Sequence, residues 1–395
     1  MMPIPFAKRF DGITGSAIRE ILRLTSKPGM ISFSGGNPSP AALREDVVLE
    51  YTQKALLRDG KNILQYGATE GYAPFLDSLE RYLSEHLTLQ ASRKEILPVA
   101  GSSQAMDLLL KALIDPGDTI LVENPTFLGN IQCMRLYQAN IVPIESDAHG
   151  VIADDLEVAV RKYHPKMVYV IPTFQNPTGC TLALDRRKRL AEMASEYQFI
   201  LAEDDPYRDL RYTGQTLPAI KTFDTTGHTA YLGSFSKIIS PGIRVGYLTA
   251  NEAIIRKCII GKQSADVHAP NITQAIVDLY LRENALPEHI NTICGAYRLQ
   301  LDAMLQELSH FPAGTRYTVP EGGLFIFVTL PNGLDAQTLL KTCIERNVAF
   351  VPGTPFYPDG GHYDTMRLNF SNSTVDTIHT GMQILKQAII DLGGY

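Results

Sequence analysis

Short apolar segments alternate with longer amphipathic segments between about residue 95 and residue 250. Five short segments have the length and apolar content of buried strands: Thr119–Glu123, Met167–Pro172, Phe199–Glu203, Thr229–Gly233 and Val245–Ala250. Apolar residues three or four positions apart predict helices over two of the longer segments, Gln104–Ile114 and Leu184–Tyr197. This alternation indicates an α/β fold, with a mostly parallel central sheet covered by helices on both faces.

The pattern changes near residue 290. One long helix is predicted over Pro287–Phe311. The strand-like segments that follow it are Arg316–Leu330, Ala349–Val351 and Met366–Phe370. We therefore expect a smaller α+β domain at the C-terminal end of the chain.

The first 45 residues contain a predicted helix, Ser16–Thr25, and a turn rich in Gly and Pro, Ser34–Pro38. We expect this segment to pack with the C-terminal unit. The predicted organisation is an N-terminal segment (1–45), a large domain (46–290) and a small domain (291–395).

Composition narrows the class of protein. The 395 residues are 45% hydrophobic and 20% charged, which is typical of a globular protein with a large core. A net charge of −6 argues against a nucleic-acid partner, because phosphate backbones are bound by clustered Lys and Arg. The one dense basic run, Arg186–Arg189, opens an amphipathic segment, and we expect it to form a solvated helix face.

The cysteines and histidines predict neither disulfides nor a metal site. Five cysteines lie far apart without a C-x-x-C pair, and nine histidines form no metal-ligand pattern. No apolar run reaches membrane-spanning length, and the N-terminal segment Met1–Arg9 lacks the apolar core of a signal peptide. We expect a cytoplasmic protein with reduced thiols and no membrane partner.

Polar clusters follow the predicted strands or open the predicted helices. These clusters are Gly101–Gln104, Asn176–Gly179, Glu203–Tyr207 and Ser234–Lys237. In α/β sheets, ligands bind beyond the carboxyl ends of the strands. An amine at such a strand end, Lys237, can form an imine with a carbonyl cofactor, while nearby hydroxyls and Arg244 can hold the cofactor's phosphate.

Each cluster also has an ordinary structural interpretation. Gly101–Gln104 can bind a phosphate with its free N–H groups, or it can simply cap the helix. Asp204 can pair with a protonated ring nitrogen, or it can be an acidic turn residue, and Asp205 could take either role. Asn176 and Tyr207 can donate hydrogen bonds to a ring hydroxyl, although Asn-Pro turns are common.

Two further residues have similar alternatives. Phe127 can stack on an aromatic cofactor or belong to the core. Arg367 interrupts an apolar strand and can bind a carboxylate through two hydrogen bonds, or it can lie at a strand edge on the surface.

Together, these motifs resemble a known family, from Ser16 to Leu368. The order of Asn176–Gly179, Asp204–Tyr207, Ser234–Lys237 and the late Arg367 is similar to that of the fold-type-I, pyridoxal-phosphate-dependent aminotransferases of class I/II. The resemblance is strongest to the branch that includes 2-aminoadipate and kynurenine aminotransferases.

The resemblance assigns cofactor roles residue by residue. It implies that Lys237 forms the imine with pyridoxal phosphate and that Asp204 pairs with the pyridine nitrogen. Asn176 and Tyr207 would contact the ring oxygen, and Phe127 would stack on the ring. The residues implied around the phosphate are Ser103, Gln104, Ser234, Ser236 and Arg244.

The resemblance also implies substrate and subunit contacts. Arg367, Asn176 and the Gly36 backbone would bind the substrate α-carboxylate. Tyr66 would reach the phosphate of the neighbouring subunit, which implies a homodimer with shared active sites. Arg19 would help to select the substrate side chain, although Asn37 stands where many relatives carry Leu and makes the pocket more polar. Phe127 stands where close relatives often carry Tyr.

The implied reaction is a ping-pong transamination from an L-amino acid, such as 2-aminoadipate or an aromatic amino acid, to a 2-oxo acid, which we expect to be 2-oxoglutarate. A C–S lyase or a decarboxylase of the same fold is the alternative, because the motifs do not fix which bond breaks. The effector domain of a transcription regulator is disfavoured, since the segment before Ser16 leaves no room for a DNA-binding domain.

Overall fold

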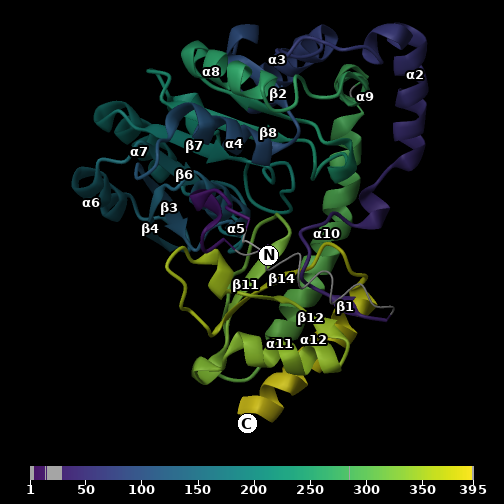
Figure 1. Ribbon diagram of the computed structural model, residues 1–395. Helices are drawn as coiled ribbons and strands as arrows, with labels where there is room; N and C mark the ends of the chain where they lie inside the picture. The colour runs from purple at the N-terminus through teal and green to yellow at the C-terminus, as the bar shows by residue number, and fades with distance from the viewer. Residues whose placement is uncertain (1–3, 14, 16–28, 284, 394–395) are drawn as a thin grey trace.

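A computed structural model describes residues 4–13, 15, 29–283 and 285–393 (Figure 1). Its helices are α2 (Glu45–Ile63), α3 (Ala73–Leu87), α4 (Ser102–Leu113), α5 (Leu128–Leu136), α6 (Ala153–Tyr163), α7 (Leu184–Tyr197), α8 (Glu252–Gln263), α9 (Asn271–Arg282), α10 (Leu286–Leu308), α11 (Ala336–Glu345) and α12 (Val375–Gly393). None of these helices combines the length and apolarity that crossing a membrane requires. The predicted helix over Ser16–Thr25 lies outside the described residues.

An eight-stranded sheet forms the centre of the larger unit, in the order β2-β9-β8-β7-β6-β3-β4-β5. Its strands are β2 (Ile96–Val99), β3 (Thr119–Asn124), β4 (Asn140–Asp147), β5 (Gly150–Val151), β6 (Met167–Val170), β7 (Ile200–Asp204), β8 (Thr229–Ser234) and β9 (Gly246–Thr249). Five neighbouring strands run parallel: β4, β3, β6, β7 and β8. The strands β9, β2 and β5 pair antiparallel with their neighbours. The predicted α/β fold with a mostly parallel sheet is therefore confirmed.

The two faces of this sheet belong to different hydrophobic clusters. Leu121 and Leu201 pack with the apolar residues of α6 and α7 on one face. Their neighbours Ile120 and Ala202 point to the opposite face, which α4 and α5 cover. Successive strand residues alternate between faces, so continuous apolar runs are needed to bury both of them.

A four-stranded antiparallel sheet, in the order β10-β11-β14-β13, forms the second unit with α11 and α12. Its strands are β10 (Arg316–Tyr317), β11 (Phe325–Thr329), β13 (Val351–Pro352) and β14 (Thr365–Asn369). β1 (Ile31–Ser32) pairs in parallel with β12 (Val348–Ala349) beside this sheet, and α10 runs between the two units (Figure 1). The domain boundaries near residues 45 and 290 stay a prediction.

One sequence-based expectation is wrong at Arg187. We expected the basic run to be solvated, but the Arg187 side chain is fully buried. Its guanidinium donates to the carbonyl oxygens of Pro172 at 2.6 Å, Leu182 at 2.9 Å and Pro218 at 2.9 Å. Buried loop carbonyls need donors, and a guanidinium can supply several in a fixed geometry. Arg187 therefore holds the loops around β6 and α7 together.

Candidate active site

A cavity of about 340 Å³ opens at the carboxyl ends of the parallel strands, beside the second unit. Most of the residues singled out in the sequence line it: Gly36, Ser103, Phe127, Asn176, Asp204, Tyr207, Ser234, Ser236, Lys237, Arg244 and Arg367. The chain order brings them together because β6, β7 and β8 are neighbours and run in the same direction. Gly36 and Arg367 reach the cavity from the side of β1 and β14.

Lys237 follows the end of β8 and presents its amine to the cavity. Its Nζ atom donates a hydrogen bond to the carbonyl oxygen of Gly36 at 2.8 Å. Burial lowers the pKa of Lys237 to about 8, and the nearby guanidinium groups of Arg367 and Arg244 add to this effect. An amine with this pKa is partly neutral near pH 8 and can attack a carbonyl carbon.

Asp204 is the last residue of β7, and its side chain is buried. Its Oδ2 atom accepts hydrogen bonds from the Tyr169 hydroxyl at 2.8 Å and from the Asn130 amide at 3.4 Å. Its Oδ1 atom is also buried, and it has no hydrogen-bond partner among the described residues. Burial raises the pKa of Asp204 to about 6 despite the hydrogen bond from Tyr169. The Oδ1 atom can therefore accept a bond from a cationic N–H group that enters the cavity.

Sequence reasoning missed Tyr169 and Asn130. Tyr169 lies on β6, directly opposite Ala202 of β7, two residues before Asp204. Residues two apart on a strand share a face, so the register of these strands places the hydroxyl beside the carboxylate. Tyr169 looked like an ordinary apolar strand residue, and only the strand pairing could have identified its role.

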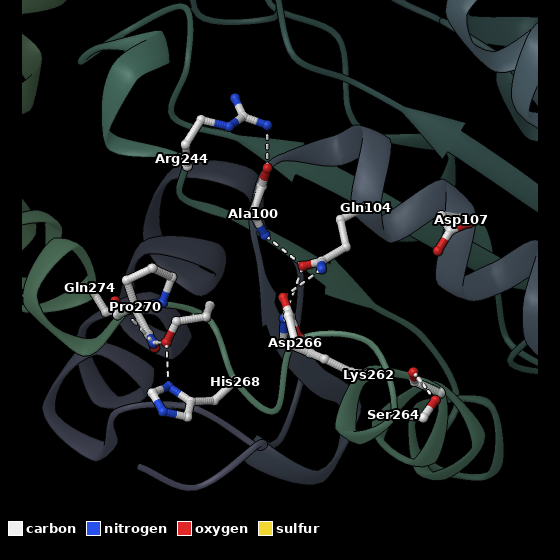
Figure 2. Close-up of polar contacts among 12 residues, drawn as sticks. Ala100, Gln104, Asp107, Arg244, Lys262, Ser264, Asp266, His268, Pro270 and Gln274 are labelled. Atoms are coloured by element: carbon white, nitrogen blue, oxygen red, sulfur yellow. Dashed lines mark hydrogen bonds and ion pairs between the residues drawn. The ribbon is translucent and has the colours of Figure 1, made fainter. Parts of the chain in front are cut away.

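One end of the cavity has the donors that a phosphate needs. The first N–H groups of α4 have no partner within the helix, and the hydroxyls of Ser234 and Ser236 lie at the end of β8. Arg244 donates to the carbonyl oxygen of Ala100, two residues before α4 begins (Figure 2). Gly101 has φ +96°, and an added Cβ would lie 2.8 Å from Nη2 of Arg244. Glycine therefore permits the close approach of this guanidinium to the helix start.

Arg367 lies in the middle of β14 and is buried. Its guanidinium donates to Asn176 Oδ1 at 2.8 Å and to the carbonyl oxygen of Ser34 at 2.6 Å, and it lies 4.2 Å from the centre of the Phe325 ring. Burial lowers the pKa of Arg367 to about 10. Its Nε atom has no hydrogen-bond partner among the described residues. A buried cation with an unused donor is well suited to bind a carboxylate.

Two aromatic residues, Tyr207 and Phe127, also line the cavity. Tyr207 is buried, and burial raises its pKa although the positive charge of Arg367 opposes the shift. The hydroxyl of Tyr207 therefore stays protonated at neutral pH and can donate a hydrogen bond. Phe127 precedes α5, and its ring lies so close to Gly129 that an added Cβ there would be 2.6 Å from the ring.

Two predicted site residues, Gln104 and Tyr66, do not line the cavity, and a third is not described. The Gln104 side chain points to Lys262 and Asp266 instead (Figure 2). The Tyr66 side chain is 81% exposed in the single chain. Arg19 lies outside the described residues.

Comparisons with known proteins give a consistent result. The family described as aminotransferase class I and II matches residues 28–385. The aromatic-amino-acid aminotransferase 1 of Thermococcus litoralis is 39% identical, over 97% of this chain and 94% of that protein. The 2-aminoadipate transaminase of Thermus thermophilus is 37% identical, over 97% of this chain and 96% of that protein.

A solved structure is similar over almost the whole chain. The Pyrococcus horikoshii kynurenine aminotransferase, in complex with PMP, superimposes with a TM-score of 0.94 at 38% identity. The match covers 98% of this chain and 97% of that chain. The two chains therefore share one fold.

Proposed function

The chain belongs to the class I and II aminotransferases, which use pyridoxal phosphate, and we propose that it moves the amino group of 2-aminoadipate, an aromatic amino acid or a similar L-amino acid to 2-oxoglutarate. Its fold is fold type I of the pyridoxal-phosphate-dependent enzymes. The observation that carries the proposal is the presence, in one cavity, of the Lys237 amine and the buried Asp204 carboxylate, whose Oδ1 atom has no partner in the described part of the chain.

The residues of the cavity fit the cofactor. When bound, pyridoxal phosphate supplies an aldehyde for amines and a ring that withdraws electrons from the substrate α-carbon. Lys237 would hold the aldehyde, and the Oδ1 atom of Asp204 would accept the ring N–H group. The start of α4, Ser234, Ser236 and Arg244 would hold the phosphate. Phe127 would contact the ring face.

Two residues, Arg367 and Lys237, would act on the substrate, and Asn176 and Tyr207 would support them. Arg367 would bind the α-carboxylate with the donor that is unpaired in this structure, and Asn176 would orient the guanidinium through their 2.8 Å hydrogen bond. Once the substrate amine has displaced Lys237 from the aldehyde, the freed Nζ atom would take the proton from the substrate α-carbon as a general base. The Tyr207 hydroxyl, beside Asn176, would donate to the ring oxygen.

A homodimer is the second part of the proposal. Large apolar side chains are exposed along α2 and the segment after it: Leu57 is 88% exposed, Leu64 is 69% exposed and Tyr66 is 81% exposed. Exposed apolar groups of this size favour an interface, and a second copy of the chain is the partner we propose. Tyr66 would then reach the neighbouring phosphate, and Arg19 would contribute to side-chain selection.

A panel of amino donors tests the substrate class. With 2-oxoglutarate as acceptor, we expect glutamate to form with 2-aminoadipate and with aromatic donors, and the absorbance of the bound cofactor to change on addition of each active donor alone. Release of pyruvate and ammonia without glutamate would instead indicate a lyase.

A further inference from the structure

Lys262 lies in the last turn of α8, and its side chain is fully buried. Its Nζ atom donates to both carboxylate oxygens of Asp266, at 2.8 and 3.0 Å, and to Oε1 of Gln104 at 2.9 Å. The Gln104 amide donates to Asp266 at 2.7 Å and closes the triangle (Figure 2). Burying an ammonium group is costly unless its hydrogen bonds are satisfied, and here it has three acceptor atoms.

The triangle is connected to the backbone at the phosphate end of the cavity. Oε1 of Gln104 also accepts a hydrogen bond from the Ala100 N–H at 2.8 Å. The carbonyl oxygen of Ala100 accepts a hydrogen bond from Arg244 (Figure 2). Ala100 is therefore held by a side chain at its N–H and by another at its carbonyl, one residue before Gly101.

The chain after Lys262 makes a second connection, to the residues beside Tyr66. His268 accepts a hydrogen bond from the Gly67 N–H at 3.1 Å, and its ring centre lies 6.0 Å from that of Tyr66. Between Asp266 and His268, Val267 has φ +67°, which is rare for a β-branched residue. The hydrogen bonds of both neighbours hold this strained backbone in place.

We propose that Lys262 and Asp266 are positioning residues for the cofactor phosphate. They hold the side chain of Gln104, which holds Ala100, and so they fix the turn from which α4 presents its first N–H groups. Neither residue lines the cavity, so their effect on the phosphate passes through Gln104. The inference rests on the proposed function, because it takes the ligand at this end of the cavity to be a phosphate.

Binding of two aldehydes separates positioning of the phosphate from general folding. The probes are pyridoxal phosphate and pyridoxal, which lacks the phosphate. For Lys262→Met and for Asp266→Asn, we expect the Kd of pyridoxal phosphate to rise about tenfold or more, because charge-assisted hydrogen bonds are lost. The Kd of pyridoxal is expected to change less than about twofold.

Lys221 offers a matched control. It is another largely buried lysine, whose Nζ atom donates to the carbonyl oxygen of Thr229 at 2.8 Å and lies 4.0 Å from Asp224. It does not line the cavity. For Lys221→Met, we expect both Kd values to stay at the wild-type level.

If Lys262→Met fails to fold, Asp266→Asn still tests the inference, because it preserves the shape of the side chain. Wild-type affinity for pyridoxal phosphate in Asp266→Asn, or an equal loss for both aldehydes, would overturn the inference. Failure of the proposed function gives a different result, since wild-type protein would then form no borohydride-stable adduct at Lys237 with either aldehyde.

Discussion

At the scale of single residues, the chemistry depends on how the cavity changes Lys237 and Asp204. Burial lowers the pKa of Lys237 and raises the pKa of Asp204, so each group is shifted toward its neutral form in the absence of ligand. A bound aldehyde would use the neutral amine, and a protonated ring nitrogen would restore a partner to the carboxylate. The same desolvation therefore prepares both residues for one ligand.

The pKa of Lys237 makes a prediction about the rate of cofactor capture. The neutral amine is the reactive form, and with a pKa of about 8 its fraction rises from about a tenth at pH 7 to a half at pH 8 and nine-tenths at pH 9. Stopped-flow mixing of cofactor-free protein with pyridoxal phosphate is expected to show a rate that rises about fivefold from pH 7 to pH 8 and then levels off.

A rate that continues to rise about tenfold per pH unit up to pH 10 would contradict this prediction, because it would indicate the ordinary lysine pKa of 10.5. Arg367→Met provides a further check. It removes a nearby positive charge, and the midpoint is expected to move to higher pH.

Site residues that stand in recognisable sequence motifs could be predicted, whereas a site residue within an ordinary apolar strand could not. Lys237, Asp204 and Arg367 stand in motifs of characteristic order, and the structure places all three at the cavity. Tyr169 could not be recognised, because its position beside Asp204 depends on strand register. The roles assigned to individual residues stay predictions until they are tested.

At the scale of elements, the strand ends and helix starts determine where the site forms. The long apolar strands were predicted to within one or two residues, because buried parallel strands are continuous apolar runs. The edge strand β5 and its neighbour β4 were missed, since β4 is only partly buried and β5 has two residues. The periodic pattern over α7 was predicted with its observed bounds, but it could not show that Arg187 points inward.

Gly101 tests the start of α4. Gly101→Ala is expected to cost about 1–3 kcal/mol of stability from backbone strain at φ +96° and to weaken pyridoxal phosphate binding about tenfold, because the methyl group displaces Arg244. Gly117→Ala is the control, since Gly117 has φ +92° with nothing near its Cβ position. Equilibrium titration with the cofactor should show a loss of affinity in Gly101→Ala alone, and equal affinity in the two variants would refute this role.

Arg187 tests the loops around α7. Arg187→Met leaves buried carbonyl oxygens without donors, and we expect the free energy of unfolding to fall by about 3 kcal/mol in urea denaturation. Arg189 lies on the same helix as Arg187, and Arg189→Met, which removes a partly exposed ion pair with Glu157 of α6, should cost less than about 1 kcal/mol. Similar losses for the two variants would show that the buried hydrogen bonds of Arg187 contribute little.

At the scale of the whole molecule, the cavity lies where two sheets approach each other. Lys237 and Asp204 come from the large sheet, whereas Gly36 and Arg367 lie on or beside strands of the second unit. The site is complete only when both units are folded and in contact. The order of the motifs indicated that they share one site, but neither the distances between them nor the cavity could be obtained from the sequence.

The exposed apolar residues of α2 predict a dimer. Sedimentation of the wild-type protein is expected to give twice the mass of one 43.6 kDa chain, and Leu57→Glu is expected to lower that mass and weaken cofactor binding. Val158→Glu is the control, since Val158 is 67% exposed on α6, on the opposite side of the molecule from α2 (Figure 1). A wild-type protein that sediments as a monomer at micromolar concentration would contradict the proposed assembly.

Borohydride reduction of the protein loaded with pyridoxal phosphate, followed by peptide mass mapping, tests the central claim most directly. We expect one phosphopyridoxyl group per chain, attached to Lys237, and none in Lys237→Ala. A group attached to another lysine, or unchanged labelling and full transaminase turnover in Lys237→Ala, would contradict the account.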